Sequence, residues 1–150
     1  VEKLGSNWVC AFPRFPNDMD AHYEQWKWWF EKHIPFMRDN IVCVGHSLGG
    51  VFLAAYLGRQ TLPVHCAQLH LVAPVLSEGD FILPESLEHI TEQVSRIYIY
   101  HSEDDAVVPI SHSETYAHKL PGAEFVRFTD RGHFFSQSEF PELVARIIGE

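Results

Sequence analysis

The chain has 150 residues, 46% of them hydrophobic, and carries a formal net charge of −9 at pH 7. This length and apolar content predict one domain, residues 1–150, with a single buried core. The negative charge argues against nucleic acid and anionic membrane as partners, because both bind through a basic face. No run of about 18 apolar residues is present that could form a transmembrane helix.

Three cysteines, Cys10, Cys43 and Cys66, lie in apolar runs that resemble strands. Their number is odd and their spacing matches no metal-binding motif. We therefore expect buried, reduced thiols in a cytoplasmic protein that holds neither a metal nor a cofactor.

The N-terminal part of the chain predicts one strand and one helix. Residues 1–5 resemble the last turn of a helix closed by a glycine, and residues 8–12 predict a strand that is followed by prolines. A helix is expected from about Asp20 to His33. Three aromatic residues at i, i+3 and i+7 form its sheet-facing side: Tyr23, Trp26 and Phe30.

The segment that follows has the pattern of a nucleophile elbow. The apolar run 41–44 predicts a buried strand, and residues 45–49, GHSLG, fit G-x-S-x-G. Residues 51–57 predict a helix, so the motif joins a strand to a helix. Such a turn holds its serine, here Ser47, in a strained conformation that raises Oγ above the sheet. Side chains at positions 45 and 49 are expected to collide with the strand and helix.

Strands and helices alternate over the remainder of the chain. The expected strands are residues 68–72, 96–100 and 124–128, and the expected helices are residues 85–90, 111–119 and 139 or 140 to 148. This alternation predicts an α/β fold with a mainly parallel sheet and helices on both faces. Ligands bind beyond the carboxyl ends of the strands in such sheets.

Three chemically matched residue types follow the ends of three different predicted strands: Ser47, Asp104 or Asp105, and His133. A serine hydroxyl needs a base to become a nucleophile, and an imidazole held by a carboxylate is the common solution. The order serine, aspartate, histidine is that of the α/β-hydrolases. The sequence therefore predicts a catalytic triad.

Other interpretations of these polar residues remain open. Asp104 is an alternative acid, and Asp130 is more simply a turn residue. His46 is expected to support the elbow. A metal cluster is a further alternative, although the spacing of its four members matches no standard ligand pattern: His101, Asp104, Asp105 and His112.

Three segments resemble the motifs of a known family. They are residues 45–50 (GHSLGG), 101–109 (HSEDDAVVP) and 128–134 (FTDRGHF). They resemble the small α/β-hydrolase-fold serine hydrolases typified by retinoblastoma-binding protein nine, and the likeness spans nearly the whole chain. The resemblance implies a three-layer α/β-hydrolase fold, with Asp105 as the acid and His133 as the base.

The oxyanion hole is only half accounted for. The backbone N–H of Leu48 is one expected donor, and the second normally comes from a loop after an earlier strand. No such strand and loop precede the elbow, because residues 8–12 match the next strand of the family fold. We therefore expect a domain that is N-terminally incomplete and lacks one strand.

The leading hypothesis is a serine hydrolase that cleaves a small ester, thioester or amide through an acyl-Ser47 intermediate. The alternative is a non-catalytic module that binds a protein partner on the same scaffold. A third option, lyase or dehalogenase chemistry, fits less well because dehalogenases carry a carboxylate at the elbow. Four apolar residues are expected to line a modest pocket: Trp28, Phe81, Leu83 and Phe134.

Overall fold

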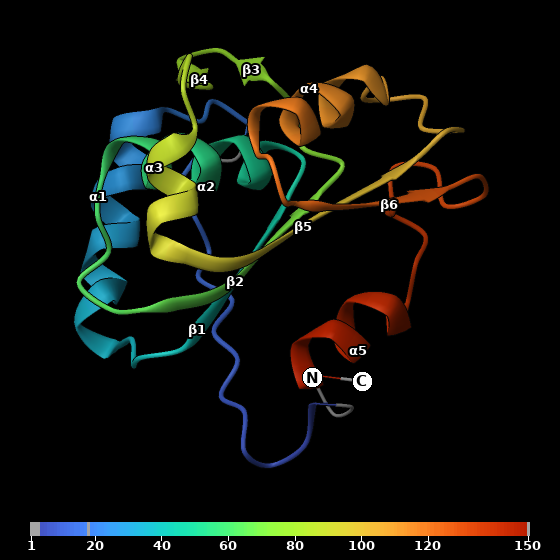
Figure 1. Ribbon diagram of the computed structural model, residues 1–150. Helices are drawn as coiled ribbons and strands as arrows, with labels where there is room; N and C mark the ends of the chain where they lie inside the picture. Colours follow the sequence, from blue (N-terminus) through green and yellow to red (C-terminus); the bar gives the residue numbers. More distant parts are fainter. Residues whose placement is uncertain (1–3, 18, 150) are drawn as a thin grey trace.

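The computed structural model describes residues 4–17 and 19–149. Its centre is a four-stranded parallel sheet in the order β1-β2-β5-β6 (Figure 1). The strands are β1 (Ile41–His46), β2 (Cys66–Val72), β5 (Val94–Ser102) and β6 (Glu124–Phe128). The central strands β2 and β5 are the most buried, as expected where helices cover both faces.

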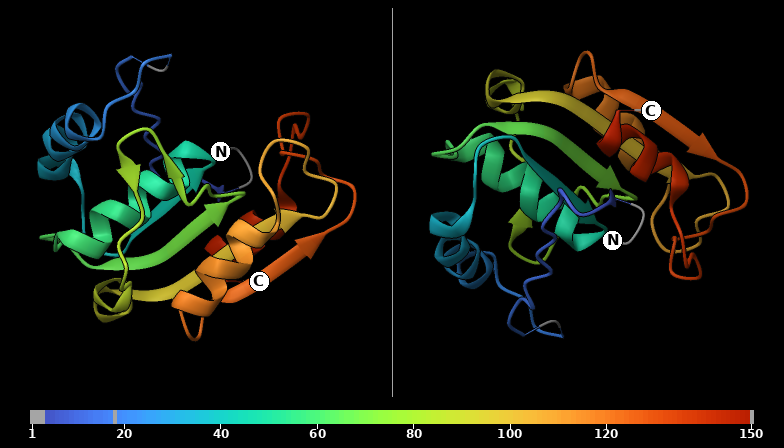
Figure 2. Two further views of the ribbon diagram at one scale, coloured as in Figure 1. Left: turned by 90° about the horizontal axis from the view of Figure 1, so that it is seen from above. Right: turned by 90° about the horizontal axis from the view of Figure 1, so that it is seen from below.

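Helices cover the two faces of the sheet unequally. They are α1 (Tyr23–His33), α2 (Leu48–Arg59), α3 (Glu88–Gln93), α4 (Ser111–Lys119) and α5 (Pro141–Ile148), with a 3-10 turn at Ile34–Phe36. Figures 1 and 2 show α1 to α4 on one side and α5 on the other. The predicted α/β fold with a parallel sheet and helices on both faces is confirmed.

Alternation along the central strands builds a core on each face. Leu69 and Ile99 belong to the large cluster under α1 to α4, whereas Val72 and Tyr100 belong to a smaller cluster beneath the sheet. Leu143 of α5 packs into the smaller cluster. Successive side chains of a strand point to opposite faces, so a single strand contributes to both cores.

The aromatic face predicted for α1 is confirmed. Tyr23, Trp26 and Phe30 are buried, and each ring contacts Phe52 of α2 at centroid distances of 5.6 to 5.9 Å. Trp28 lies off this face and is 57% exposed. The i, i+3, i+7 spacing therefore identified the buried side of the helix.

The strand predicted at residues 8–12 is wrong. The segment has no regular structure, and Val9 and Phe12 are 94% and 81% exposed. An apolar, β-branched segment forms a strand only where another strand pairs with its backbone, and none does so in the described part of the chain. The helix end predicted at residues 1–5 falls mostly outside the described residues.

The region between β2 and β5 also differs from expectation. A small antiparallel hairpin of β3 (Ser77–Glu78) and β4 (Phe81–Ile82) follows β2. Asp80 lies in the turn of this hairpin. Its side chain accepts a hydrogen bond at 2.9 Å from the backbone N–H of Tyr23, where α1 begins. The helix predicted at residues 85–90 begins three residues later, at Glu88. Contacts between residues far apart in the sequence, such as this one, leave no local sequence pattern.

Candidate active site

Ser47 occupies a strained turn between β1 and α2. Its φ of 52° and ψ of −115° lie outside the regions that non-glycine residues favour. The turn is held on both sides: the N–H of Ser47 donates to the carbonyl of Val72 at 2.9 Å, and its own carbonyl accepts from Gly50 at 3.0 Å. Strain of this kind persists only where the surroundings determine the backbone, and it is common at functional sites.

Two glycines, Gly45 and Gly50, make the elbow sterically possible. The motif suggested Gly45 and Gly49 instead. A Cβ at Gly45 would lie 2.5 Å from the carbonyl oxygen of Gly49, and a Cβ at Gly50 would lie 2.8 Å from Cβ of Pro74. A Cβ at Gly49 would meet nothing within 4 Å. The collision predicted for position 45 is confirmed and the one predicted for position 49 is wrong.

His133 and Asp105 form a buried hydrogen-bonded pair. Nδ1 of His133 donates to Oδ2 of Asp105 at 2.7 Å, and the two side chains are 2% and 0% exposed. The other carboxylate oxygen, Oδ1, accepts the N–H groups of Val107 and Val108 at 2.8 and 2.9 Å. Burial alone would raise the pKa of Asp105, but the donors at Val108, His133 and Val107 outweigh it and lower the pKa.

The second nitrogen of the His133 ring has no partner. Nδ1 donates to Asp105, whereas Nε2 is buried with no hydrogen-bond partner in the structure. The ring lies against the elbow: its centroid is 4.7 Å from that of His46, the neighbour of Ser47. Nε2 and the hydroxyl of Ser47 are not hydrogen-bonded to each other here.

Asp104 has a different set of partners. Its Oδ1 accepts the hydroxyl of Ser102 at 2.5 Å and the N–H of Gly132 at 2.9 Å, while the N–H of Arg131 donates to Ser102 Oγ at 3.0 Å. These hydrogen bonds, first that from Ser102 and then that from Gly132, lower the pKa of Asp104. Asp104 therefore ties the end of β5 to the loop that carries His133, and Asp105 is the aspartate that contacts the ring.

Two other candidates also have structural partners. Nε2 of His46 donates to the backbone carbonyl of His133 at 2.9 Å, so His46 joins the elbow to the histidine loop. Burial lowers the pKa of His46, against the opposing effect of that hydrogen bond. Asp130 is 80% exposed and lies 3.5 Å from Nε of Arg131. Neither side chain takes the place of Asp105 behind the His133 ring.

Each of the four residues considered as a metal cluster has hydrogen-bond partners outside that group. His101 contacts Ser113 and Val108, whereas Nδ1 of His112 accepts the N–H of Leu76 at 3.2 Å. Over residues 4–17 and 19–149, no group of three or more histidine, cysteine, aspartate or glutamate side chains is arranged to hold a metal ion.

Leu48 begins α2 directly after Ser47. The N–H groups of the first helical turn have no acceptor within the helix, and the helix dipole adds a partial positive charge at this end. The carbonyl of Ser47 accepts the N–H groups of Gly50 and Val51. The backbone N–H of Leu48 thus lies next to Ser47, at the positive end of the α2 dipole.

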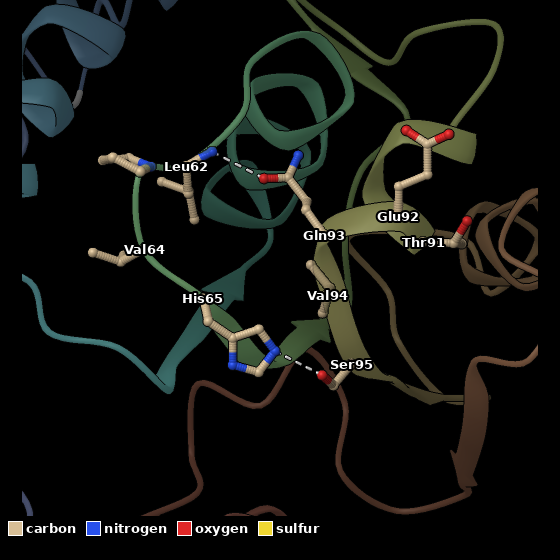
Figure 3. A pocket seen from close by; sticks show the side chains of 9 residues that line it. Leu62, Val64, His65, Thr91, Glu92, Gln93, Val94 and Ser95 are labelled. Carbon is tan, nitrogen blue, oxygen red and sulfur yellow. Dashed lines mark hydrogen bonds between the residues drawn. The ribbon is translucent and has the colours of Figure 1, made fainter.

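A groove of about 540 Å³ lies at the opposite edge of the sheet (Figure 3). It is formed by residues 62–65 and 91–95, around the beginnings of β2 and β5. Two hydrogen bonds join residues that line it: His65 with Ser95 at 2.8 Å, and the N–H of Leu62 with Gln93 at 3.0 Å. This groove is remote from Ser47, because the elbow follows the carboxyl end of β1.

The apolar residues expected to line a pocket are not brought together. Phe81 is 1% exposed and packs in the core with Trp26, and Leu83 packs against the same core. Trp28 is exposed on α1, and Phe134 stacks on Phe140 on the other face of the sheet. Phe135 was not anticipated: it is 76% exposed and its ring lies 4.7 Å from that of His133.

Comparison with known proteins identifies the family. A family model described as serine hydrolase matches residues 14–146. The chain belongs to the serine hydrolase family. No curated protein sequence matches it.

Solved structures share the fold of this serine hydrolase at low sequence identity. The ydeN gene product of B. subtilis superposes with a TM-score of 0.81 at 20% identity, over 92% of this chain and 81% of that one. An alpha-beta serine hydrolase homologue from Coxiella burnetii gives 0.57 at 24% identity, over 85% and 57%. A monoacylglycerol lipase from Paleococcus ferrophilus gives 0.63 at 13%, over 86% and 76%. At these identities the likeness establishes the α/β-hydrolase fold alone.

None of the helices in residues 4–17 and 19–149 combines the length and the apolar character that crossing a bilayer requires.

Proposed function

We propose that this serine hydrolase cleaves a small ester, thioester or amide through an acyl intermediate on Ser47, with His133 as the base and Asp105 as the acid of the triad. The observation that supports it most is the buried His133–Asp105 pair, whose second ring nitrogen is unpartnered and lies beside the elbow. Within the family, the three motifs favour a place near the retinoblastoma-binding protein nine group.

The proposed reaction begins with proton transfer. Nε2 of His133 removes the proton of Ser47 Oγ as the oxygen attacks the substrate carbonyl, which requires the two atoms to come within hydrogen-bonding distance in the complex. Asp105 keeps Nδ1 protonated and stabilises the imidazolium that forms. The backbone N–H of Leu48 donates to the tetrahedral oxyanion.

Collapse of the tetrahedral intermediate releases the first product. The imidazolium returns its proton to the leaving alkoxide, thiolate or amine, and an acyl ester remains on Ser47. Water then attacks this ester with His133 again as the base, and the acid product leaves with the serine restored. No group outside the chain is consumed except substrate and water.

The size of the connection after β2 bears on the substrate. Residues 73–87 contain only the β3–β4 hairpin, and the hairpin is tied to α1 and α2 through Asp80 and Arg59. A connection of this length is too short for a separate lid domain, which favours small acyl groups over long lipids. Exposed Phe135 beside the His133 ring supplies an apolar surface for such a group.

Labelling with a fluorophosphonate tests the proposal. The wild-type chain is expected to gain one adduct on Ser47, measured by intact mass and peptide mapping. Ser47→Ala is expected to gain none, and His133→Gln to react at least about 1,000-fold more slowly, because the serine is then without its base. Ser111→Ala, a surface change at the start of α4, is the matched control and should react like the wild type.

An adduct on another serine, or none in a folded chain, would reject the proposal. In the second case, binding of a protein partner without turnover becomes the better account of this fold.

A further inference from the structure

A second buried histidine lies behind the carboxylate of Asp105. His101 is in β5, is 0% exposed, and uses both ring nitrogens. Nδ1 is 2.6 Å from the hydroxyl of Ser113 in α4, and Nε2 is 2.9 Å from the carbonyl oxygen of Val108. Nε2 is also 3.3 Å from Oδ2 of Asp105, the oxygen that receives His133.

These partners determine where the His101 proton lies. A carbonyl oxygen can only accept, so Nε2 carries the hydrogen and donates it to Val108. Burial lowers the pKa of His101, against the raising effects of Val108 and Asp105, so the ring is neutral and Nδ1 accepts the hydroxyl proton of Ser113. The N–H edge of the ring therefore faces both the Val108 carbonyl and the Asp105 carboxylate.

The backbone of Val108 links this ring to Asp105. Its N–H donates to Oδ1 of Asp105, while its carbonyl accepts from His101. Val108 thus anchors the turn that bears Asp105 through two contacts, one at its N–H and one at its carbonyl. If the carbonyl were released, both the N–H donor and the carboxylate that it orients would be free to move.

We propose that His101 is a positioning residue that holds the turn of residues 105–108, so that Oδ2 of Asp105 meets Nδ1 of His133. The assignment of this contact to hydrolysis rests on the function proposed above, whereas the positioning itself does not. An apolar residue of similar volume would fill the space without the cost of burying two ring nitrogens, so packing alone does not account for histidine here.

The test measures the His133–Asp105 hydrogen bond directly. A proton shared at 2.7 Å gives a strongly downfield NMR resonance, which is assigned in histidine-labelled protein by its loss in His133→Gln. His101→Leu keeps volume without a donor, and His101→Gln keeps an N–H where Nε2 lies. We expect the resonance to move upfield or disappear in His101→Leu and to be restored in His101→Gln.

Kinetics with p-nitrophenyl acetate provide the second readout. Loss of orientation should lower kcat by about 10- to 100-fold in His101→Leu with KM changed by less than about twofold, because a misplaced group costs rate more than binding. His101→Gln should recover most of kcat. Ser113→Ala removes the hydroxyl that orients the ring through Nδ1, so it should give a smaller loss in the same direction.

A wild-type resonance in folded His101→Leu would overturn the proposal, whatever the activity. If His101→Leu does not fold, the comparison passes to Ser113→Ala and His101→Gln, and an unmoved resonance in Ser113→Ala would then reject it. A resonance that responds as expected in a protein that neither hydrolyses the ester nor reacts with the fluorophosphonate would preserve the positioning role and reject the proposed hydrolysis.

Discussion

Two adjacent aspartates at the end of β5 have different tasks, although they share charge, size and local sequence. Asp105 points inward, where its carboxylate receives one ring nitrogen and two backbone N–H groups. Asp104 points toward the histidine loop and fastens it through Ser102 and Gly132. A single step along the chain after a strand reverses the direction of the side chain, so proximity in sequence says little about function here.

Replacing each aspartate by asparagine distinguishes their two roles. Asp105→Asn is expected to lower kcat/KM by about 10⁴-fold, because an amide does not hold the His133 tautomer or stabilise the imidazolium. Asp104→Asn should cost less than about tenfold, because its side-chain oxygen still accepts from Ser102 and Gly132. Steady-state kinetics on one ester checks both. A larger loss in Asp104→Asn than in Asp105→Asn would contradict the assignment.

At the scale of elements, the strand–turn–helix unit of β1 and α2 depends on close backbone contact. The first turn of α2 crosses the end of β1 so closely that only hydrogen fits at Gly45, and Pro74 from the loop after β2 closes on Gly50. The same closeness brings the start of α2 beside the Ser47 hydroxyl. The steric tightness and the position of the Leu48 N–H next to Ser47 therefore have one structural cause.

Gly45→Ala and Gly49→Ala are a matched pair within this unit. Gly45→Ala places Cβ 2.5 Å from a backbone oxygen that cannot move freely, so the free energy of unfolding should fall by about 1–3 kcal/mol. Gly49→Ala meets open space in a helix and should leave stability unchanged or raise it by up to about 1 kcal/mol. Urea denaturation of both variants measures the difference, and equal losses would contradict the account.

The whole molecule is a sheet with two unequal cores. The larger core lies under α1 to α4, and the smaller one, closed by α5, contains the buried side chain of His70. Nδ1 of His70 is 2.9 Å from the Tyr100 hydroxyl and Nε2 is 2.8 Å from Oε1 of Gln68. Arg146 of α5 lies over the ring of Tyr100, 5.8 Å from its centroid. A positive charge on His70 would be buried, and the charge of Arg146 would repel it.

Global stability should therefore depend on pH through His70. Burial, and secondarily Arg146, lower the pKa of His70 to about 4, below its ordinary value of 6.5. Between pH 6.5 and 4 the unfolded chain binds a proton that the folded chain does not, so the free energy of unfolding falls as the pH falls. This residue alone contributes a loss of roughly 3 kcal/mol by pH 4.

Denaturation curves between pH 7 and 4 test this linkage. His70→Gln should show a shallower decline than the wild type, whereas His118→Gln, at an exposed position of α4, should follow the wild-type slope. Parallel slopes for the wild type and His70→Gln would mean that the ring is not held neutral by burial.

Much of this architecture is already present in local patterns. The alternation of strands and helices, the aromatic face of α1 and the glycine–serine turn all depend on residues within a few positions of one another, so periodicity and turn chemistry reveal them. The hydrogen bond of Asp105 to His133, that of Asp104 to Gly132 and the tightness between Gly50 and Pro74 depend instead on residues far along the sequence. So does the absence of a strand partner for residues 8–12 in the described part of the chain. A strand forms only where a second strand pairs with its backbone, and Asp105 is oriented only where the His133 ring reaches it. Local sequence patterns do not reveal which distant groups will come into contact.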